Sequence, residues 1–349
     1  MRYTLLGRSG LRVSELALGT MTFGEAWGWG ASEEESRRVF EAFVDAGGNF
    51  VDTACNYTDG QSESIVGALV GPERERFVVA TKYTLTARRD DPNAGGNHRK
   101  NLVQTLEASL RRLRTDYVDL LWLHMWDGMT PVDEVVRALD DLVSSGKVLY
   151  LGISDTPAWV VSQAVTLADL RGWTPFVAVQ GPYSLVDRDV ERELLPMARD
   201  LGLTFTPWGM LEGGALTGKY LDAGTEPRRY DGVGSRANAM AREVLSVADE
   251  LDASPSQVAI AWVRTQPWHT IPIVGARSEA QLRENLRALD VELSQKQLER
   301  LDAAGEFRLG FPREFLESEH VRGLIFGDTF ELIDDPRALG AGELTAVPS

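Results

Sequence analysis

Four polar side chains stand at or just after the ends of three successive apolar segments. Asp52 and Tyr57 lie in NFVDTACNY, Lys82 ends FVVATK, and His124 lies in YVDLLWLHMWD. Each apolar segment is typical of a buried strand, where a polar side chain is costly unless it has a partner. An acid, an amine, a phenol and an imidazole at the same position of neighbouring strands therefore predict one shared site.

These four residue types suit protonation of a carbonyl oxygen. Asp52 can supply the counter-charge that a buried Lys82 needs. The Lys82 ammonium is expected to lower the pKa of Tyr57 from its ordinary value of about 10. Tyr57 would then serve as a general acid for a carbonyl oxygen, and His124 would donate a second hydrogen bond to that oxygen. Each residue alone also has a structural interpretation, and only the joint arrangement favours catalysis.

Eight short apolar segments alternate with helical patterns. The predicted strands are 16–19, 49–53, 77–82, 117–124, 148–154, 176–180, 204–208 and 271–274. The predicted helices are about 33–46, 99–112, 132–146, 158–170, 187–201, 237–251, 278–289 and 294–305, the first opened by a capping box at Ser32-Glu33-Glu34-Glu35. Strands of this composition, with little alternation, are typical of a parallel sheet covered on both faces.

Eight strand–helix units predict an α/β fold of the (β/α)8 TIM-barrel type rather than a doubly wound sheet. No G-x-G-x-x-G follows the first strand, which also favours the barrel. We expect residues 1–349 to form one domain, with a β-hairpin at 1–15 closing the bottom of a barrel at 16–290. Residues 291–349 would be a helical C-terminal extension that frays from about Asp334.

Composition restricts the partners. The 349 residues include one cysteine, Cys55, and carry a formal net charge of −16. We therefore expect no intramolecular disulfide, a cytoplasmic location and no nucleic-acid partner. No apolar run approaches the roughly 20 residues of a membrane span, and no signal peptide is evident. The sequence does not indicate an oligomeric state.

Over nearly its whole length the chain resembles the aldo-keto reductase family. The matching stretches are LGRSGLRVSELALGTMTFG, DAGGNFVDTACNY, SLRRLRTDYVDLLWLH, GKVLYLGISD, LTGKY and IPIVGARSEAQLRENL. The resemblance implies a (β/α)8 barrel that binds NADPH and uses an Asp–Tyr–Lys–His tetrad. That tetrad corresponds to Asp52, Tyr57, Lys82 and His124 without substitution.

The resemblance also implies cofactor contacts around the barrel mouth. Ser154, Asp155 and Gln180 would bind the nicotinamide carboxamide, and Trp208 would stack on its ring. Arg277 would pair with the 2′-phosphate, so NADPH/NADP+ is expected and NADH less so. The further expected contacts are Thr20, Met21, Asp52, Leu211, Lys219, Arg236, Gly275, Gln281, Glu284 and Asn285.

Two stretches depart from expected patterns. Asp155 stands where the family usually has Asn, and a carboxylate accepts from the carboxamide NH₂ but cannot donate to its oxygen. The family's Trp-Ser-Pro-Leu is Trp208-Gly209-Met210-Leu211 here. The segment from Gly213 nearly spells a P-loop but ends in Tyr220 instead of Ser or Thr, which leaves a pyrophosphate-facing loop or a plain surface loop.

The expected substrate is a small-molecule carbonyl compound. Trp29, Tyr83 and Trp126 would form an aromatic rim, although loop tryptophans can equally pack on the scaffold. One alternative is an NADP(H)-binding redox-sensing or accessory protein with little turnover. A Schiff-base aldolase would need a neutral Lys82, which Asp52 opposes. A zinc hydrolase would rest on a single local pair, His124 and Asp127, so no metal is expected.

Overall fold

The computed structural model describes residues 1–86, 88–219, 221, 235–305 and 307–334. The chain divides into two compact units, Met1–Gly305 and Glu306–Ser349. The tail that was expected to fray lies almost entirely outside the described residues, as does Tyr220.

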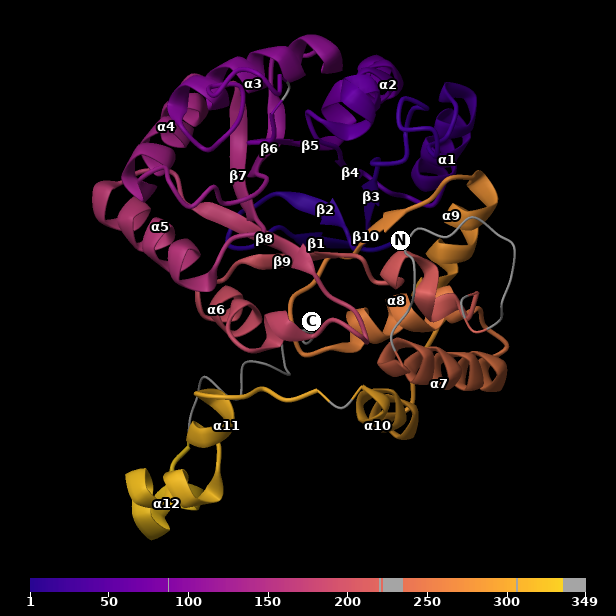
Figure 1. Cartoon of the computed structure of the whole chain (residues 1–349), viewed down its shortest axis with the longest axis vertical. Coiled ribbons are helices and arrows are strands. Elements are labelled where there is room, and N and C mark those ends of the chain that lie inside the picture. Colours follow the sequence, from indigo (N-terminus) through magenta and orange to yellow (C-terminus); the bar gives the residue numbers. More distant parts are fainter. Residues whose placement is uncertain (87, 220, 222–234, 306, 335–349) are drawn as a thin grey trace, which may run out of the picture. The chain divides into compact units, whose positions relative to one another are not determined.

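Eight parallel strands form the barrel, which confirms the predicted fold class (Figure 1). In spatial order they are β10 (Ile273–Gly275), β3 (Ala17–Gly19), β4 (Phe50–Asp52), β5 (Val78–Tyr83), β6 (Val118–Leu123), β7 (Val148–Ser154), β8 (Phe176–Pro182) and β9 (Thr204–Trp208). The last gap is bridged by backbone bonds, from Phe205 N to His269 O at 3.0 Å and from Ile271 N to Phe205 O at 2.9 Å.

Helices surround this barrel. They are α1 (Glu33–Asp45), α2 (Gln61–Val70), α3 (Arg99–Leu113), α4 (Val132–Ser144), α5 (Ala158–Arg171), α6 (Leu194–Asp200), α7 (Ser235–Leu251), α8 (Pro255–Thr265), α9 (Glu279–Leu286) and α10 (Gln295–Ala304). Ser32 caps α1 by accepting from Glu35 N at 3.2 Å. The Glu35 carboxylate instead binds Arg38 and Glu279 N, so only half of the predicted capping box forms.

Three segments differ from the predicted helices. The segment predicted as one helix at 187–201 contains a 3-10 turn, Asp189–Glu191, and the short α6. Pro196 lies in the first turn of α6 because proline is tolerated there and would break the interior of a longer helix. Helices α2 and α8 were not predicted. For α8 the signals were present, since Ser254 and Gln257 form a capping box and Pro255 occupies the first helical position between them.

The N-terminal hairpin closes the barrel at the start of its strands. Strands β1 (Tyr3–Leu5) and β2 (Arg12–Ser14) are antiparallel, as the sequence predicted. Leu6 and Val13 are fully buried and pack with Phe50 and Ile271 in an inner core cluster. Trp122 fills the same interior, and Gly152 on the next strand has no side chain because a Cβ there would lie 2.2 Å from the indole. The interior of the barrel is therefore a packed core, which the hairpin closes at the start of the strands.

The second unit is described over residues 307–334. It holds α11 (Arg313–Leu316), α12 (Glu319–Phe326) and a 3-10 segment, Gly327–Leu332. Several of its apolar side chains are exposed: Phe311, Phe315, Leu316, Leu324, Ile325, Leu332 and Ile333.

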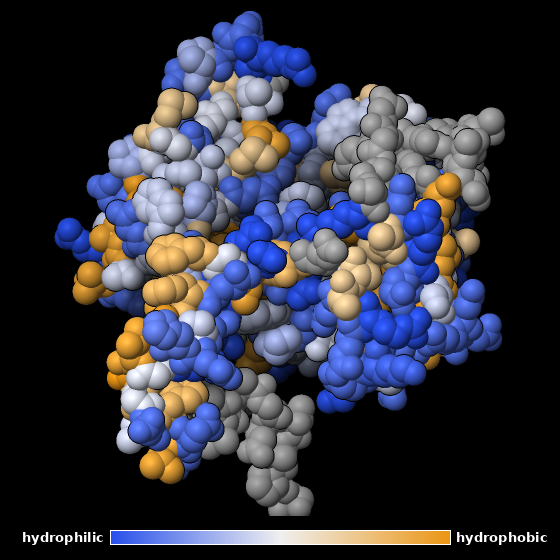
Figure 2. Space-filling view, turned by 60° about the horizontal axis from the view of Figure 1, so that its bottom comes forward, coloured by the Kyte–Doolittle hydropathy of each residue, from blue (hydrophilic) through white to orange (hydrophobic). Residues whose placement is uncertain are grey.

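The face drawn in Figure 2 is mostly hydrophilic, with smaller hydrophobic patches. Within the described parts of the chain, no helix is both long and apolar enough to cross a membrane.

Truncation of Leu6 tests how the hairpin packs on the inner core of the barrel. Leu6→Ala should lower the free energy of unfolding by about 2–5 kcal/mol, because it leaves a cavity among fully buried neighbours. Leu5→Ala is the matched control, since Leu5 is 47% exposed and should cost about 0.5 kcal/mol or less. Urea denaturation measures both. Equal effects would show that the hairpin does not seal the core.

Candidate active site

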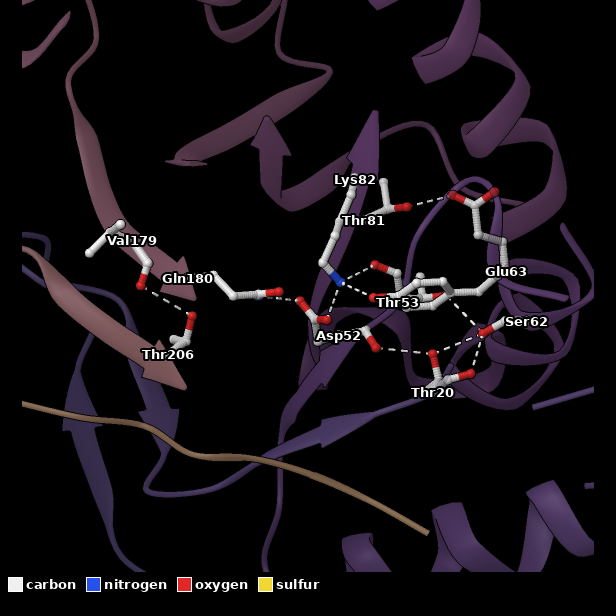
Figure 3. Close-up of polar contacts among 11 residues, drawn as sticks. Thr20, Asp52, Thr53, Ser62, Glu63, Thr81, Lys82, Val179, Gln180 and Thr206 are labelled. Atoms are coloured by element: carbon white, nitrogen blue, oxygen red, sulfur yellow. Dashed lines mark hydrogen bonds and ion pairs between the residues drawn. The ribbon is translucent and has the colours of Figure 1, made fainter. Parts of the chain in front are cut away.

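The ammonium of Lys82 is the centre of the site at the carboxyl ends of the strands. Its side chain is fully buried at the end of β5. It donates to Asp52 Oδ1, to Thr53 O at 2.9 Å and to Tyr57 Oη at 3.0 Å (Figure 3). An ammonium has three donors, so these three acceptors satisfy it completely.

Asp52, at the end of β4, connects Lys82 of the neighbouring strand β5 with Gln180 of the distant strand β8. One carboxylate oxygen accepts from Lys82, and the other accepts from Gln180 Nε2 of β8 at 3.3 Å (Figure 3). Burial works to lower the pKa of Lys82, but the neighbouring Asp52 and Tyr57 outweigh it and raise that pKa above its ordinary value. Lys82 is therefore held in its charged form.

Tyr57 is brought to Lys82 by a tight turn after β4. The 3-10 segment Tyr57–Gly60 has left-handed backbone at Thr58 and Asp59, and the Thr58 hydroxyl donates to Phe23 O at 2.6 Å. Burial raises the pKa of Tyr57 above its ordinary value, although Lys82 opposes that rise. The expectation of a lowered pKa was wrong, because the loss of solvent around the phenol outweighs the nearby positive charge.

His124 follows β6 and faces Tyr57. The two rings meet edge to face with their centroids 6.0 Å apart. Burial, with Lys82 adding to it, lowers the pKa of His124 to about 3, so the imidazole is neutral at pH 7. Its Nδ1 is buried and has no hydrogen-bond partner. The structure therefore brings all four predicted residues together and keeps the imidazole uncharged.

Buried polar atoms without partners continue around the mouth to the end of β7. Ser154 Oγ and Asp155 Oδ1 are both of this kind, and burial raises the pKa of Asp155. Two strands further on, Trp208 ends β9 and is 40% exposed. Unpaired donors and acceptors beside an exposed indole fit a planar ring that carries an amide, as a nicotinamide does.

The loop after β9 and the start of α9 hold most of the other expected cofactor contacts. Lys219 lies over the loop at Gly214, where a Cβ would be 2.7 Å from its Nζ. Arg277 is exposed, and its backbone N–H donates to Gln281 Oε1 at 3.0 Å. Glu35 already accepts from Glu279 N at 2.8 Å, so an anion bound here would rely on the Arg277 side chain more than on the helix N-terminus.

The remaining expected contacts have different surroundings. Asn285 is buried and donates to Gly275 O at 3.3 Å. Thr20 is fully buried, with its hydroxyl on Asp52 O at 3.0 Å, so it supports the site from beneath. Met21 and Leu211 are half-buried, and Glu284 and Arg236 are exposed, the latter in the first turn of α7.

The expected aromatic rim is only partly present. Trp29 is exposed and packs on Trp27 with their ring centroids 5.6 Å apart, and Trp126 is half-buried against the core. Tyr83 is fully buried, and its hydroxyl donates to Asn97 O at 3.4 Å. Its assignment to the rim was wrong, because β5 continues through Tyr83 and directs this side chain into the core between strands and helices.

Sequence reasoning missed the residues that support the tetrad. Thr53 supplies the carbonyl that accepts from Lys82, and Ser62 of the unpredicted α2 lies behind it. The available signal was the run QSESIVGALV after Asp59-Gly60, which has helical length but no strong amphipathic pattern. Among the described residues, no group of three or more His, Cys, Asp or Glu side chains could hold a metal ion.

Comparison with known proteins agrees with this geometry. Residues 15–306 match the model of the Aldo/keto reductase family. A norsolorinic acid reductase of Aspergillus flavus is 38% identical over 322 residues, which cover 89% of this chain and 83% of the relative. An aryl-alcohol dehydrogenase [NADP(+)] of Phanerodontia chrysosporium is 38% identical, covering 91% and 87%. A putative aryl-alcohol dehydrogenase of Saccharomyces cerevisiae is 36% identical, covering 88% and 87%.

The protonation state of His124 can be tested directly. The unfolded chain protonates this imidazole below pH about 6.5, whereas the folded chain keeps it neutral to a pKa of about 3. Its contribution to the free energy of unfolding should therefore fall as the pH drops through that window. An imidazole NMR titration, assigned with His124→Gln, should show no protonation at pH 5. A midpoint near 6.5 would contradict the buried neutral state.

Proposed function

Because the chain belongs to the aldo/keto reductase family of oxidoreductases, we propose that it reduces an aldehyde or ketone to an alcohol with NADPH. Tyr57 is the general acid in this proposal. The observation that carries it is the complete use of the three Lys82 donors on Asp52, Thr53 and Tyr57. The phenol oxygen accepts from the ammonium, which leaves the phenol proton available to a substrate.

The charges around Tyr57 suit proton donation at neutral pH. Its raised pKa keeps the phenol protonated before reaction. As the proton leaves, the phenolate gains the hydrogen bond and the positive charge of Lys82, so stabilisation grows along the reaction. Asp52 keeps Lys82 charged throughout. NADPH, when bound, supplies a hydride to the carbonyl carbon.

His124 orients the carbonyl oxygen in this proposal. A neutral imidazole beside Tyr57 can donate a hydrogen bond without competing as an acid, and its lowered pKa keeps it in that form. Two donors at one oxygen fix both the position and the direction of the carbonyl group. They also stabilise the negative charge that develops on that oxygen during reduction.

Ser154, Asp155 and Trp208 would hold the nicotinamide. The unpaired atoms Ser154 Oγ and Asp155 Oδ1 can bond the carboxamide, with Asp155 Oδ1 accepting from its NH₂. The exposed indole of Trp208 can stack on the ring and fix the face that meets the substrate. Arg277 would bind the 2′-phosphate, which supports NADPH over NADH.

The substrate class is proposed from the relatives and the rim. The relatives are named for aryl alcohols and for norsolorinic acid. Trp29 with Trp27 and the half-buried Trp126 offer aromatic surface in this chain's loops. We therefore expect aromatic aldehydes or ketones to be better substrates than short aliphatic ones. Schiff-base chemistry is disfavoured, because the raised pKa of Lys82 keeps its amine protonated.

Removal of the phenol hydroxyl tests the reaction. Tyr57→Phe should lower kcat for NADPH oxidation with an aromatic aldehyde by a factor of about 10² to 10⁴. NADPH binding, followed by fluorescence, should be unchanged. Tyr150→Phe is the matched control, because this phenol lies near the start of β7 against the inner core. Near-normal kcat in Tyr57→Phe would refute the assignment, and tight NADPH binding by a wild type without turnover would favour an accessory protein.

Removal of the Arg277 guanidinium tests the cofactor preference. Arg277→Ala should raise the KM for NADPH about 10- to 100-fold, because a charge-assisted contact to phosphate is lost. The KM for NADH should not change. Arg283→Ala, in the helix α9 that follows Arg277, is the control, since Arg283 pairs with Glu279. Similar KM values for both cofactors, unaffected by Arg277→Ala, would contradict a 2′-phosphate site.

A further inference from the structure

We propose that Ser62 is a positioning residue of the active site, whose hydroxyl fixes the peptide segment that binds Lys82. Ser62 is hydrogen-bonded to neither Lys82 nor Tyr57, and it acts through Thr53 and Thr20 (Figure 3). The inference rests on the proposed function, because it assigns a role in aligning the proton donor.

The hydroxyls around Ser62 form a chain whose direction is set by chemistry. Ser62 Oγ lies 2.7 Å from Thr20 O and 2.9 Å from Thr20 Oγ1. We assign its single proton to Thr20 O, because this contact is the shorter one and a carbonyl can only accept. Thr53 Oγ1, 2.9 Å from Ser62 Oγ, must then be the donor of that pair. The Thr20 hydroxyl donates onward to Asp52 O at 3.0 Å. One end of the chain thus holds the backbone carbonyl of Asp52, and the other holds the Thr53 side chain.

This chain of bonds is fully buried. Thr20, Thr53 and Ser62 all have 0% exposed surface, so no solvent can replace a missing partner. The hydroxyl of Thr53 is bonded to Ser62, and the backbone carbonyl of the same Thr53 accepts from Lys82 at 2.9 Å. A small movement of the Thr53 peptide therefore moves an acceptor of the ammonium directly, and with it the contact from Lys82 to Tyr57.

The first turn of α2 makes a second attachment beside this one. Glu63 is fully buried, accepts from the Thr81 hydroxyl at 2.5 Å and pairs with Arg112 at 2.6 Å. Thr81 precedes Lys82 on β5. Consecutive residues of α2 therefore hold the ends of two strands, Ser62 at β4 and Glu63 at β5 (Figure 3). With β5 held by Glu63, loss of the Ser62 hydroxyl should move the β4 end relative to Lys82.

Ser62→Ala and Ser64→Ala form the test pair, since Ser64 lies on the same helix and bonds only the local Gly60 O at 3.1 Å. NADPH oxidation is followed with benzaldehyde and its para-substituted derivatives. Ser62→Ala should lower kcat about tenfold and leave the KM for NADPH within about twofold, because the proton donor is misaligned while the cofactor contacts remain. Ser64→Ala should match wild type. Equal kcat in both variants would overturn the proposal.

A measurement independent of turnover separates this inference from the proposed function. With ¹³Cζ-labelled tyrosine, the Tyr57 resonance is assigned by its absence in Tyr57→Phe. It should shift in Ser62→Ala and stay in place in Ser64→Ala. An unshifted resonance refutes the positioning role, even if the wild type reduces no aldehyde and the proposed function fails. If Ser62→Ala does not fold, Ser62→Cys, a weaker donor of similar size, takes its place in both measurements.

Discussion

The buried ammonium of Lys82 is the constraint on which the rest of the site depends. A fully buried charge is costly, and it persists here because Asp52, Thr53 O and Tyr57 take all three of its protons. Each of these partners must then be held in place by something else. Gln180 of β8 is bonded to Asp52, and Ser62 of α2 is bonded to the Thr53 side chain.

Burial, more than any single charge, sets the protonation of the site. It raises the pKa of Tyr57 despite Lys82, and it lowers the pKa of His124 with help from Lys82. The result is a protonated phenol beside a neutral imidazole, which is the pair that a carbonyl oxygen requires. The barrel achieves this by excluding water from strand ends that a packed interior closes from below.

The buried polar groups at the mouth of the barrel are of two kinds: some have hydrogen-bond partners and others have none. Around Lys82 every donor is used, whereas Ser154 Oγ, Asp155 Oδ1 and His124 Nδ1 are buried without partners. The paired groups build a rigid site, and the open ones mark where the proposed cofactor would be held. In a chain with a net charge of −16, Arg277 would supply the local positive charge that the proposed anionic cofactor needs.

The sequence by itself determined the barrel and the four residues at its mouth. Each buried strand is a mostly apolar run, and the runs through β4, β5 and β6 lead into Asp52, Lys82 and His124. It could not determine the role of Ser62, the burial of Tyr83 or the direction of the Tyr57 pKa. A serine in QSESIVGALV and a tyrosine after FVVATK have no distinctive local pattern. Their roles depend on which neighbours surround them and how much water is excluded, and only tertiary packing decides both.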